Sequence, residues 1–358
     1  FMGFESNLKK YNKLTQKVIQ GMGNLSRLRE EDIEIGTTPK EIAFREDKMI
    51  LYHFLPMVAE PLNCPILLVS PLINRPFMVD LQSDRSLVAN LLKLGLDIYL
   101  IDWGYPTRGD RWLTLDDYIN GYIDSCINYI RTSHNLEQIN LLGICQGGTF
   151  SLCYSSIYPQ RIKNLIVMVT PVDFHLTDAL LNMRAGCTLG AEALDVDLLV
   201  DTLGNIGGND LNLEFLMLKP WQLGIQKYLD FAEIMDDENK LLNFLRMEKW
   251  IFDSPDQAGE AYRQYLKDFY QENKLIKGQV VIGEHRVDLS KISMPVLNVY
   301  AEKDHLVPPK SSLALEKYIS TQDYTVQSFS VGHIGMYVSS KVQQTLPPVI
   351  TEWLQTRS

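Results

Sequence analysis

A cysteine framed by glycines is the feature of this sequence best suited to chemistry. The segment from Gly143 to Gly148 reads G-I-C-Q-G-G, and it lies between an apolar run typical of a buried strand and a segment typical of a helix. That context matches a nucleophile elbow, the G-x-S-x-G turn, with cysteine in place of serine. Gly143 and Gly147 lack the side chains that would clash in so sharp a turn. The dipole of the following helix should lower the pKa of the Cys145 thiol, so Cys145 is the predicted nucleophile.

An acid and a base follow Cys145 in the chain, in the order that such a site requires. Asp304 comes just after the apolar run 295–301, and His333 comes just after the run near 324–329. Because both runs are predicted strands of one parallel sheet, their carboxyl ends should meet at the edge that carries the elbow. The order of nucleophile, acid and base is typical of this arrangement. We therefore expect His333 to act as the base and Asp304 to orient it.

Backbone N–H groups near Cys145 are candidates for holding the oxyanion that forms when a carbonyl is attacked. The N–H of Gln146 follows the nucleophile directly and is the first candidate. The second should come from the loop 70–77, after the predicted strand 65–69, and we assign it to the N–H of Ile73. The loop contains two prolines, so an ordinary turn explains its composition equally well.

The other reactive side chains are expected to be structural. Glu302 could replace Asp304 as the orienting acid, and His305 is expected to line the same wall of the pocket without a catalytic role. The remaining candidates lack the spacing of metal ligands or suit predicted helices: His53, His134, His175, His285, Cys126, Cys153, Asp116 and Asp117. No glycine-rich stretch matches a phosphate-binding loop or a dinucleotide fingerprint. We therefore expect no metal site and no resident cofactor.

Predicted strands and helices alternate on both sides of the elbow. Two short strands are expected in 40–55, and an amphipathic helix is expected near the N-terminus. The predicted buried strands are 65–69, 97–101, 139–142, 165–169, 295–301 and 324–329, and the predicted helices are 84–94, 114–132, one from 146, 311–319 and 341–354. This order predicts an α/β fold with a mostly parallel sheet covered by helices. Together with the elbow, it is typical of the α/β-hydrolase fold.

The alternation of strands and helices stops at Pro171 and resumes at Pro295. The pattern between them is helical and irregular, so we expect a helical cap inserted near the sheet edge where ligands bind. The predicted organisation is an N-terminal helical segment at 1–34, an α/β core at 35–170 and 291–358, and a cap subdomain at 171–290.

The composition excludes several classes of protein. Of the 358 residues, 46% are hydrophobic, which is enough for a large core. The 34 Lys and Arg against 44 Asp and Glu give a net charge of -10, so nucleic-acid binding is not expected. No apolar run reaches the ~18 residues of a transmembrane segment, and the N-terminal residues carry no secretory pattern. The 5 cysteines form no paired pattern, which favours the cytoplasm.

A thiolate at this position suits a thioester donor, because exchange of one thioester for another is nearly balanced in energy. The acyl group would then stay on Cys145 until an acceptor arrives. Water as the acceptor would make the protein a cysteine-dependent thioesterase or esterase, whereas a hydroxyl in a site that excludes water would make it a transferase. A non-catalytic CoA-ester binding module would instead tolerate Cys145→Ala. Spacing alone does not choose between these outcomes.

Stretches spread over most of the chain match a known family in the correct order. They read LINRP at 72–76, YLIDWGYP at 99–106, LDDYI at 115–119, LGICQGG at 142–148, TPVD at 170–173, FLRMEKW at 244–250, DQAGE at 256–260, DHLVPP at 304–309 and GHIG at 332–335. On these stretches the chain resembles the catalytic subunit of class III, two-subunit poly(3-hydroxyalkanoate) synthases. Several long matches are more specific than the elbow alone, and the three proposed catalytic residues do not depart from the family pattern.

The resemblance implies an enzyme that polymerises (R)-3-hydroxyacyl-CoA, above all 3-hydroxybutyryl-CoA, into a polyester and releases CoA. Cys145 would carry the growing polyester chain, His333 would activate the thiol, and Asp304 would orient His333 or help to activate the incoming 3-hydroxyl. The resemblance also implies a second, non-catalytic synthase subunit, a homodimer of this chain, and residence on polyhydroxyalkanoate granules in the cytoplasm. The short N-terminal segment fits the two-subunit class.

Overall fold

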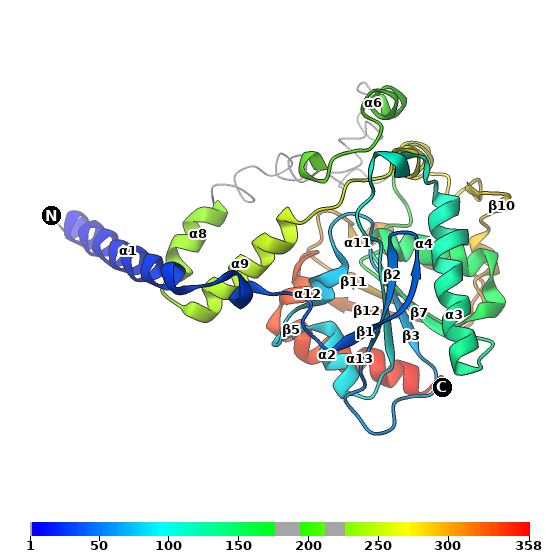
Figure 1. The fold of residues 1–358 in the computed structure, drawn as a ribbon, viewed down its shortest axis with the longest axis horizontal. Helices are drawn as coiled ribbons and strands as arrows, with labels where there is room; N and C mark the ends of the chain where they lie inside the picture. Colours follow the sequence, from blue (N-terminus) through cyan, green and yellow to red (C-terminus); the bar gives the residue numbers. More distant parts are fainter. Residues whose placement is uncertain (1, 176–193, 212–225) are drawn as a thin grey trace.

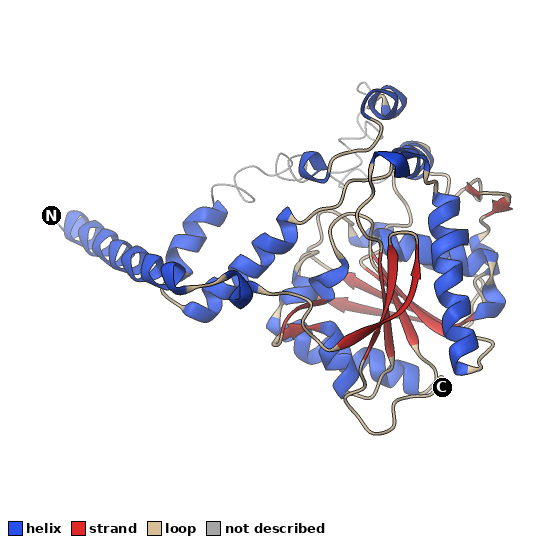
Figure 2. Cartoon of the chain, viewed as in Figure 1, coloured by secondary structure: helices blue, strands red, loops and turns tan. Residues whose placement is uncertain are grey.

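The computed structural model describes residues 2–175, 194–211 and 226–358. Eight strands of these residues form one sheet in the order β1-β2-β6-β3-β7-β8-β11-β12. Figure 2 shows the strands of the chain in red, with helices beside them in blue. They are β1 (Lys40–Glu46), β2 (Met49–Phe54), β3 (Ile66–Val69), β6 (Ile98–Asp102), β7 (Ile139–Ile144), β8 (Ile162–Met168), β11 (Val296–Ala301) and β12 (Tyr324–Phe329). From β6 to β12 in this order the strands are parallel, and β1 and β2 form an antiparallel edge. The predicted α/β fold is confirmed.

Helices cover both faces of the sheet, which is why its central strands are continuous apolar runs (Figure 1). On one face lie α3 (Asp124–His134) and α4 (Gln146–Ile157), whose Ile127 and Phe150 join one core cluster. On the other lie α2 (Leu87–Lys93) and α13 (Ser340–Gln355), whose Leu91 and Leu346 join a second cluster. Every side chain of β3 and β7 is buried between these layers.

The helix predicted at 114–132 begins as expected but is not regular throughout. The N–H of Thr114 donates to Asp117 Oδ2 over 2.8 Å, and the N–H of Asp117 donates to Thr114 Oγ1 over 3.3 Å, which is a reciprocal cap. Asp117–Ile123 then form a π-helical segment, η4, before α3 begins. The helix predicted at 84–94 is shortened to α2, because residues 80–86 pair as two short strands and Ser86 caps the helix.

The other short elements of the core complete the connections. They are η1 (Glu30–Ile33), η2 (Pro76–Val79), β4 (Asp80–Gln82), β5 (Arg85–Ser86), η3 (Arg108–Trp112), η5 (Pro159–Arg161), η8 (Leu289–Lys291), α11 (Pro309–Leu313), η9 (Ala314–Lys317) and α12 (Gly335–Val338).

The segment 171–290 is joined closely to the core at its carboxyl end. Its described elements are α6 (Val196–Leu203), α8 (Gln226–Ile234), α9 (Glu238–Phe252), α10 (Gly259–Gln264), the π-helical segment η7 (Tyr265–Gln271), β9 (Val281–Ile282) and β10 (His285–Arg286). The hairpin of β9 and β10 was not predicted by the helical pattern. Phe269, Val280 and Leu289 lie in the same core cluster as the helices over the sheet. The last part of the segment therefore packs as core.

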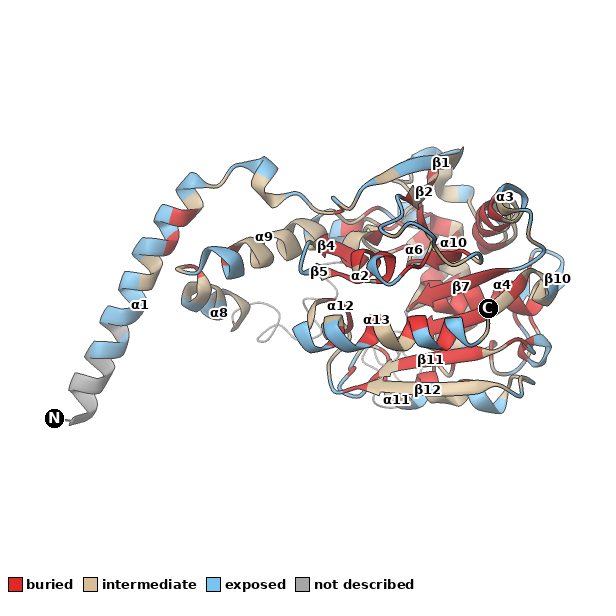
Figure 3. Ribbon diagram, turned by 90° about the horizontal axis from the view of Figure 1, so that it is seen from below, coloured by how far each residue is buried: buried red, intermediate tan, exposed pale blue. Residues whose placement is uncertain are grey.

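The helix expected near the N-terminus is present as α1 (Met2–Arg27), which extends from the body of the molecule beside α8 and α9 (Figures 1 and 3). Lys17 Nζ donates to the carbonyl of Glu233 over 2.7 Å, and the Asn24 amide donates to the carbonyl of Met235 over 3.2 Å. These contacts hold one side of the helix. Its opposite side is left in solvent, where Ile19 is 66% exposed.

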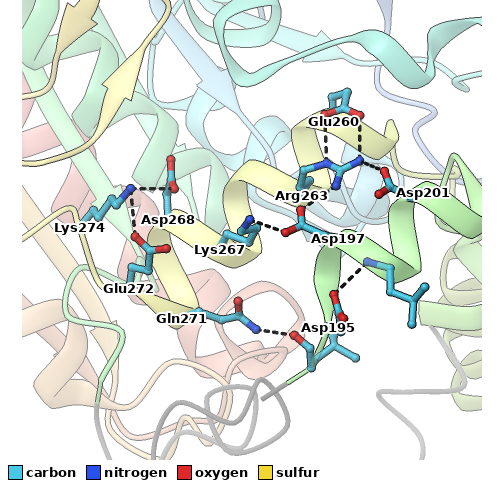
Figure 4. A network of polar contacts seen from close by, with 12 residues as sticks. Asp195, Asp197, Asp201, Glu260, Arg263, Lys267, Asp268, Gln271, Glu272 and Lys274 are labelled. Carbon is cyan, nitrogen blue, oxygen red and sulfur yellow. Dashed lines mark hydrogen bonds and ion pairs between the residues drawn. The ribbon is translucent and has the colours of Figure 1, made fainter. Parts of the chain in front are cut away.

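Ion pairs hold α6 against α10 and η7 (Figure 4). Arg263 lies 2.7 Å from Asp197 and 2.6 Å from Asp201, and Lys267 lies 2.6 Å from Asp197. Because the aspartates are largely exposed, each pair contributes little by itself. Together they fix the position of α6 over the segment that begins at Tyr265.

Candidate active site

Cys145 lies at the sharp turn between β7 and α4, with φ 52° and ψ -120°. This backbone conformation is strained for a residue with a side chain, and strain of this kind is typical of functional sites. The N–H of Cys145 donates to the carbonyl of Met168 over 2.9 Å, and its carbonyl accepts from the N–H of Gly148 over 2.9 Å. The turn is therefore held by β8 on one side and by the first turn of α4 on the other.

The glycines of the elbow are required by close backbone contacts. A Cβ atom on Gly147 would collide with the carbonyl of Val69 in β3, and a Cβ atom on Gly143 would lie 2.5 Å from the Cα atom of Gly148. Neither neighbour is a flexible side chain that could move aside. The elbow can therefore pack against the sheet only with glycine at these positions.

Asp304 and His333 meet at the carboxyl ends of β11 and β12. His333 Nδ1 lies 2.7 Å from Asp304 Oδ2. The other carboxylate oxygen of Asp304 accepts from the N–H groups of Leu306 and Val307, each over 2.9 Å. The buried carboxylate is thus satisfied on both oxygens, and its position is fixed by the loop that follows β11.

The side chain of His333 is hydrogen-bonded to Asp304, and both Asp304 and Cys145 act on its pKa. Burial alone would lower the pKa of His333. The interactions with Cys145 and Asp304 outweigh burial and raise the pKa of His333 to about 10. The structure therefore brings the predicted nucleophile, base and acid together at one site.

The alternatives to these three residues lie elsewhere. Glu302 accepts a hydrogen bond from Ser328 and is exposed, and His305 is exposed too. Burial raises the pKa of the Cys153 thiol to about 12 and raises the pKa of the Cys126 thiol further, so both stay protonated at neutral pH. Cys187 lies outside the described residues.

The remaining histidines and acids that the sequence singled out have structural contacts. His53 and His134 flank Asp97, and His175 bonds the carbonyls of Tyr270 and Gln271. Asp117 caps η4, Asp116 accepts from Asn120, and His285 packs against Tyr158. Within the described ranges, no three His, Cys, Asp or Glu side chains gather closely enough to hold a metal ion.

The two predicted oxyanion donors lie on segments that are joined directly. Gln146 is the first residue of α4, where a backbone N–H has no partner within the helix. Its side-chain Oε1 accepts from the N–H of Leu72 over 2.8 Å. Ile73 follows Leu72 in the loop after β3, so this bond ties the second candidate donor to the elbow. The pairing of the Gln146 side chain with Leu72 has no signal in the sequence pattern.

Two tyrosines near Cys145 were not predicted as site residues. Tyr265 begins η7, and Tyr337 lies in α12 with its ring 6.4 Å from the ring of His333. Burial, followed by nearby negative charge that includes Cys145, raises the pKa of both phenols well above its ordinary value. Both hydroxyls therefore stay neutral at ordinary pH. Neither residue belongs to a motif with recognisable spacing.

This fold and this arrangement of residues define a protein of the α/β-hydrolase class, and residues 75–339 match the family model described as "alpha/beta hydrolase fold". The chain is 65% identical to "Poly(3-hydroxyalkanoate) polymerase subunit PhaC" of Synechocystis sp., over 99% of this chain and 94% of that protein. It therefore belongs to the family of poly(3-hydroxyalkanoate) polymerase subunit PhaC, and the resemblance inferred from the sequence is confirmed. Residues 5–91 match the model described as "Poly-beta-hydroxybutyrate polymerase (PhaC) N-terminus".

Further comparisons agree with this assignment. The protein of the same name from Allochromatium vinosum is 52% identical over 97% of this chain and 98% of its own length. Among solved structures, the monoacylglycerol lipase of Paleococcus ferrophilus matches with a TM-score of 0.50 and 16% identity, over 88% of this chain and 100% of that chain. A thioesterase domain from the curacin biosynthetic pathway also matches with a TM-score of 0.50 and 15% identity, over 87% and 99%. At these identities the structural likeness shows the fold alone.

None of the described helices combines the length and the apolar character that crossing a bilayer requires.

Proposed function

We propose that this chain is the acyltransferase that polymerises (R)-3-hydroxyacyl-CoA, above all 3-hydroxybutyryl-CoA, and releases CoA. The observation that carries the proposal is the hydrogen-bonded pair of Asp304 and His333 beside Cys145, which lies at a strained elbow. Family membership supplies the class of polymerase. The chemistry of a cysteine nucleophile supplies the reason for a thioester substrate.

In the first half-reaction, the thiolate of Cys145 attacks the thioester carbonyl of the acyl-CoA. The oxyanion that forms is stabilised by the N–H groups of Gln146 and Ile73. The carbon–sulfur bond to CoA breaks, and the leaving CoA thiolate takes the proton of His333. The products are free CoA and an acyl group held on Cys145 as a thioester.

In the second half-reaction, the 3-hydroxyl of another hydroxyacyl group attacks the thioester on Cys145. His333, now neutral, takes the hydroxyl proton while the new ester bond forms. The carbon–sulfur bond to Cys145 breaks and the thiolate returns beside protonated His333. Each cycle thus lengthens the polyester by one unit and restores the starting charges.

The contacts of Asp304 favour one of the two roles considered for it. One oxygen of Asp304 faces His333 Nδ1, and the other is occupied by the N–H groups of Leu306 and Val307. Both oxygens of Asp304 therefore have partners within the protein. We therefore assign Asp304 to orienting His333 and to stabilising its protonated form.

The wider setting of the enzyme is part of the proposal. The similar proteins are named as subunits, which supports a second synthase subunit. We propose that this partner is non-catalytic and that it joins a homodimer of this chain. The family relationship also supports residence on cytoplasmic polyester granules. The chemistry needs no cofactor besides the CoA of the substrate, and the segment 171–290 would exclude water from the acyl-cysteine.

The proposed function is tested by incubating the protein with 3-hydroxybutyryl-CoA, with and without the partner subunit, and sizing the acyl product. The expected result is polyester, with one CoA released for each unit added. Release of free 3-hydroxybutyrate without polymer would identify a thioesterase instead. Binding of the CoA ester without release of CoA would identify a non-catalytic protein.

A further inference from the structure

A pair of glutamine side chains holds both polar groups of Leu72, the residue before the proposed oxyanion donor Ile73. Gln146 Oε1 accepts from the N–H of Leu72 over 2.8 Å. Gln257 Nε2 donates to the carbonyl of Leu72 over 3.0 Å. One glutamine comes from the elbow and the other from the segment between α9 and α10, so three distant parts of the chain meet at this residue.

Because the peptide bond is planar, the contact that holds the carbonyl of Leu72 also determines the direction of the next N–H. A trans peptide is planar, and its carbonyl and N–H point in opposite directions. The carbonyl of Leu72 and the N–H of Ile73 belong to the same peptide plane. When Gln257 fixes the direction of the carbonyl, it also fixes the direction in which the N–H of Ile73 points.

Gln146 fixes the preceding peptide plane, which carries the N–H of Leu72. Because Gln146 also supplies the first oxyanion donor through its own backbone N–H, its side chain sets the distance between the two donors. Within the described residues, the N–H of Ile73 has no acceptor of its own, as a donor reserved for an oxyanion requires. The loop is thus aligned from both sides of one residue.

Gln257 is itself held rigidly. It is 6% exposed. Its backbone N–H donates to the carbonyl of Ile206 over 2.7 Å and its carbonyl accepts from the N–H of Ile206 over 3.0 Å. A third contact steadies the start of the loop, since Trp103 Nε1 donates to the carbonyl of Ser70 over 2.9 Å. A buried amide with fixed main-chain partners can hold a catalytic loop at a defined angle.

We infer that Gln146 and Gln257 are positioning residues that align the N–H of Ile73 with the N–H of Gln146, so that both donors meet the oxyanion on the acyl group at Cys145. The inference rests on the proposed function and adds to it the residues that build the oxyanion site. Gln257 lies in the segment 171–290, so the position of that segment affects the rate of acyl transfer.

The test compares two reactions of Cys145 that differ in their need for an oxyanion site. Acylation by 3-hydroxybutyryl-CoA passes through a tetrahedral oxyanion, whereas alkylation by iodoacetamide is a displacement at a saturated carbon and forms none. Both reactions use the same thiolate and the same His333. Acylation is followed by rapid acid quenching and mass spectrometry of the protein, and alkylation is followed in the same way.

Gln146→Met and Gln257→Met keep the size of the side chain and remove the hydrogen bond. Each is expected to slow acylation about 10- to 100-fold, since a displaced oxyanion donor costs nearly as much as a missing one. The rate of alkylation is expected to stay within about twofold of that of the unaltered protein. The matched control is Gln264→Met, which removes an exposed bond to the carbonyl of Val281 and should leave both rates unchanged.

Two results would overturn the inference and leave the proposed function intact. Acylation of both variants at the unaltered rate would show that the donors need no alignment, and equal slowing of acylation and alkylation would show that the glutamines merely support the fold. If the unaltered protein released CoA without ever carrying an acyl group on Cys145, the proposed function itself would fail, and the inference with it.

Discussion

Asp304 Oδ2 lies 2.7 Å from His333 Nδ1, and the side chains of the two residues are only 1% and 12% exposed. The pair joins the carboxyl ends of two neighbouring strands, β11 and β12, although the two residues are 29 positions apart in the chain. A buried carboxylate fixes the ring orientation of the histidine and leaves the other ring nitrogen toward Cys145. His333 therefore lies between the carboxylate of Asp304 and the nucleophile Cys145.

Replacement of the nucleophile tests the need for sulfur. Cys145→Ser is expected to reduce CoA release roughly 10²- to 10⁴-fold, because an alkoxide is much harder to generate beside His333 than a thiolate. The rate is measured from the release of CoA with 3-hydroxybutyryl-CoA as substrate. Cys64→Ser is the control, since Cys64 bonds carbonyls at the opposite end of the sheet. Polymer formation by Cys145→Ser at a normal rate would exclude Cys145 as the acyl carrier.

Removal of the base tests the pairing of His333 with the thiol. His333→Ala is expected to slow iodoacetamide labelling of Cys145 at pH 7 about 10- to 30-fold, because an unassisted cysteine is only a few per cent thiolate at that pH. The fold should persist, as circular dichroism would verify. His305→Ala is the matched control and should label normally, since that side chain is exposed. Unchanged labelling of His333→Ala would show that His333 does not activate the thiol of Cys145.

The raised pKa of His333 makes stability depend on pH. In the folded protein the pKa is about 10 instead of the ordinary 6.5, so folding favours the protonated ring. This stabilisation is complete below the unfolded value and is lost as the pH rises through the folded value. The fall in stability with rising pH should be clearest between about pH 9 and 10, where both His and Cys of an unfolded chain have released their protons.

The melting temperature of the unaltered protein should therefore fall more steeply over that interval than the melting temperature of His333→Gln. Calorimetry at several pH values measures both slopes. Equal slopes would mean that folding does not favour protonated His333.

The elbow glycines give a prediction about packing. Gly147→Ala is expected to destabilise the fold by about 1–3 kcal/mol and to reduce labelling of Cys145, because the added methyl group collides with the carbonyl of Val69. Gly23→Ala in α1 is the control, since nothing lies within 4 Å of its added Cβ atom and alanine favours a helix. Urea unfolding of the two variants compares them. A Gly147→Ala protein as stable as Gly23→Ala would contradict the packing argument.

The sheet and the three central site residues could be predicted because their signals are local. Each buried strand is a short apolar run, and Cys145, Asp304 and His333 each follow such a run directly. In a parallel sheet, that position alone places a residue at the carboxyl edge. The structure adds the 2.7 Å contact between His333 and Asp304 and leaves the order of the three residues unchanged.

Contacts between distant segments could not be predicted in the same way. The bonds from Gln146 and Gln257 to Leu72 join residues that are 74 and 185 positions apart. Tyr265 comes close to Cys145 because η7 packs against α4, where the rings of Tyr265 and Phe150 lie 5.9 Å apart. The contacts of Gln257 and Tyr265 depend on how the segment 171–290 folds back onto the sheet, and neither periodicity nor spacing predicts how it does so.

The most direct test of the account is mass spectrometry of the protein quenched with acid during turnover of 3-hydroxybutyryl-CoA. After digestion, the peptide that contains Cys145 should carry one or more 3-hydroxybutyryl units, and the same peptide from Cys145→Ala should carry none. If CoA is released while that peptide stays unmodified at every time of quenching, acyl transfer through Cys145 is contradicted.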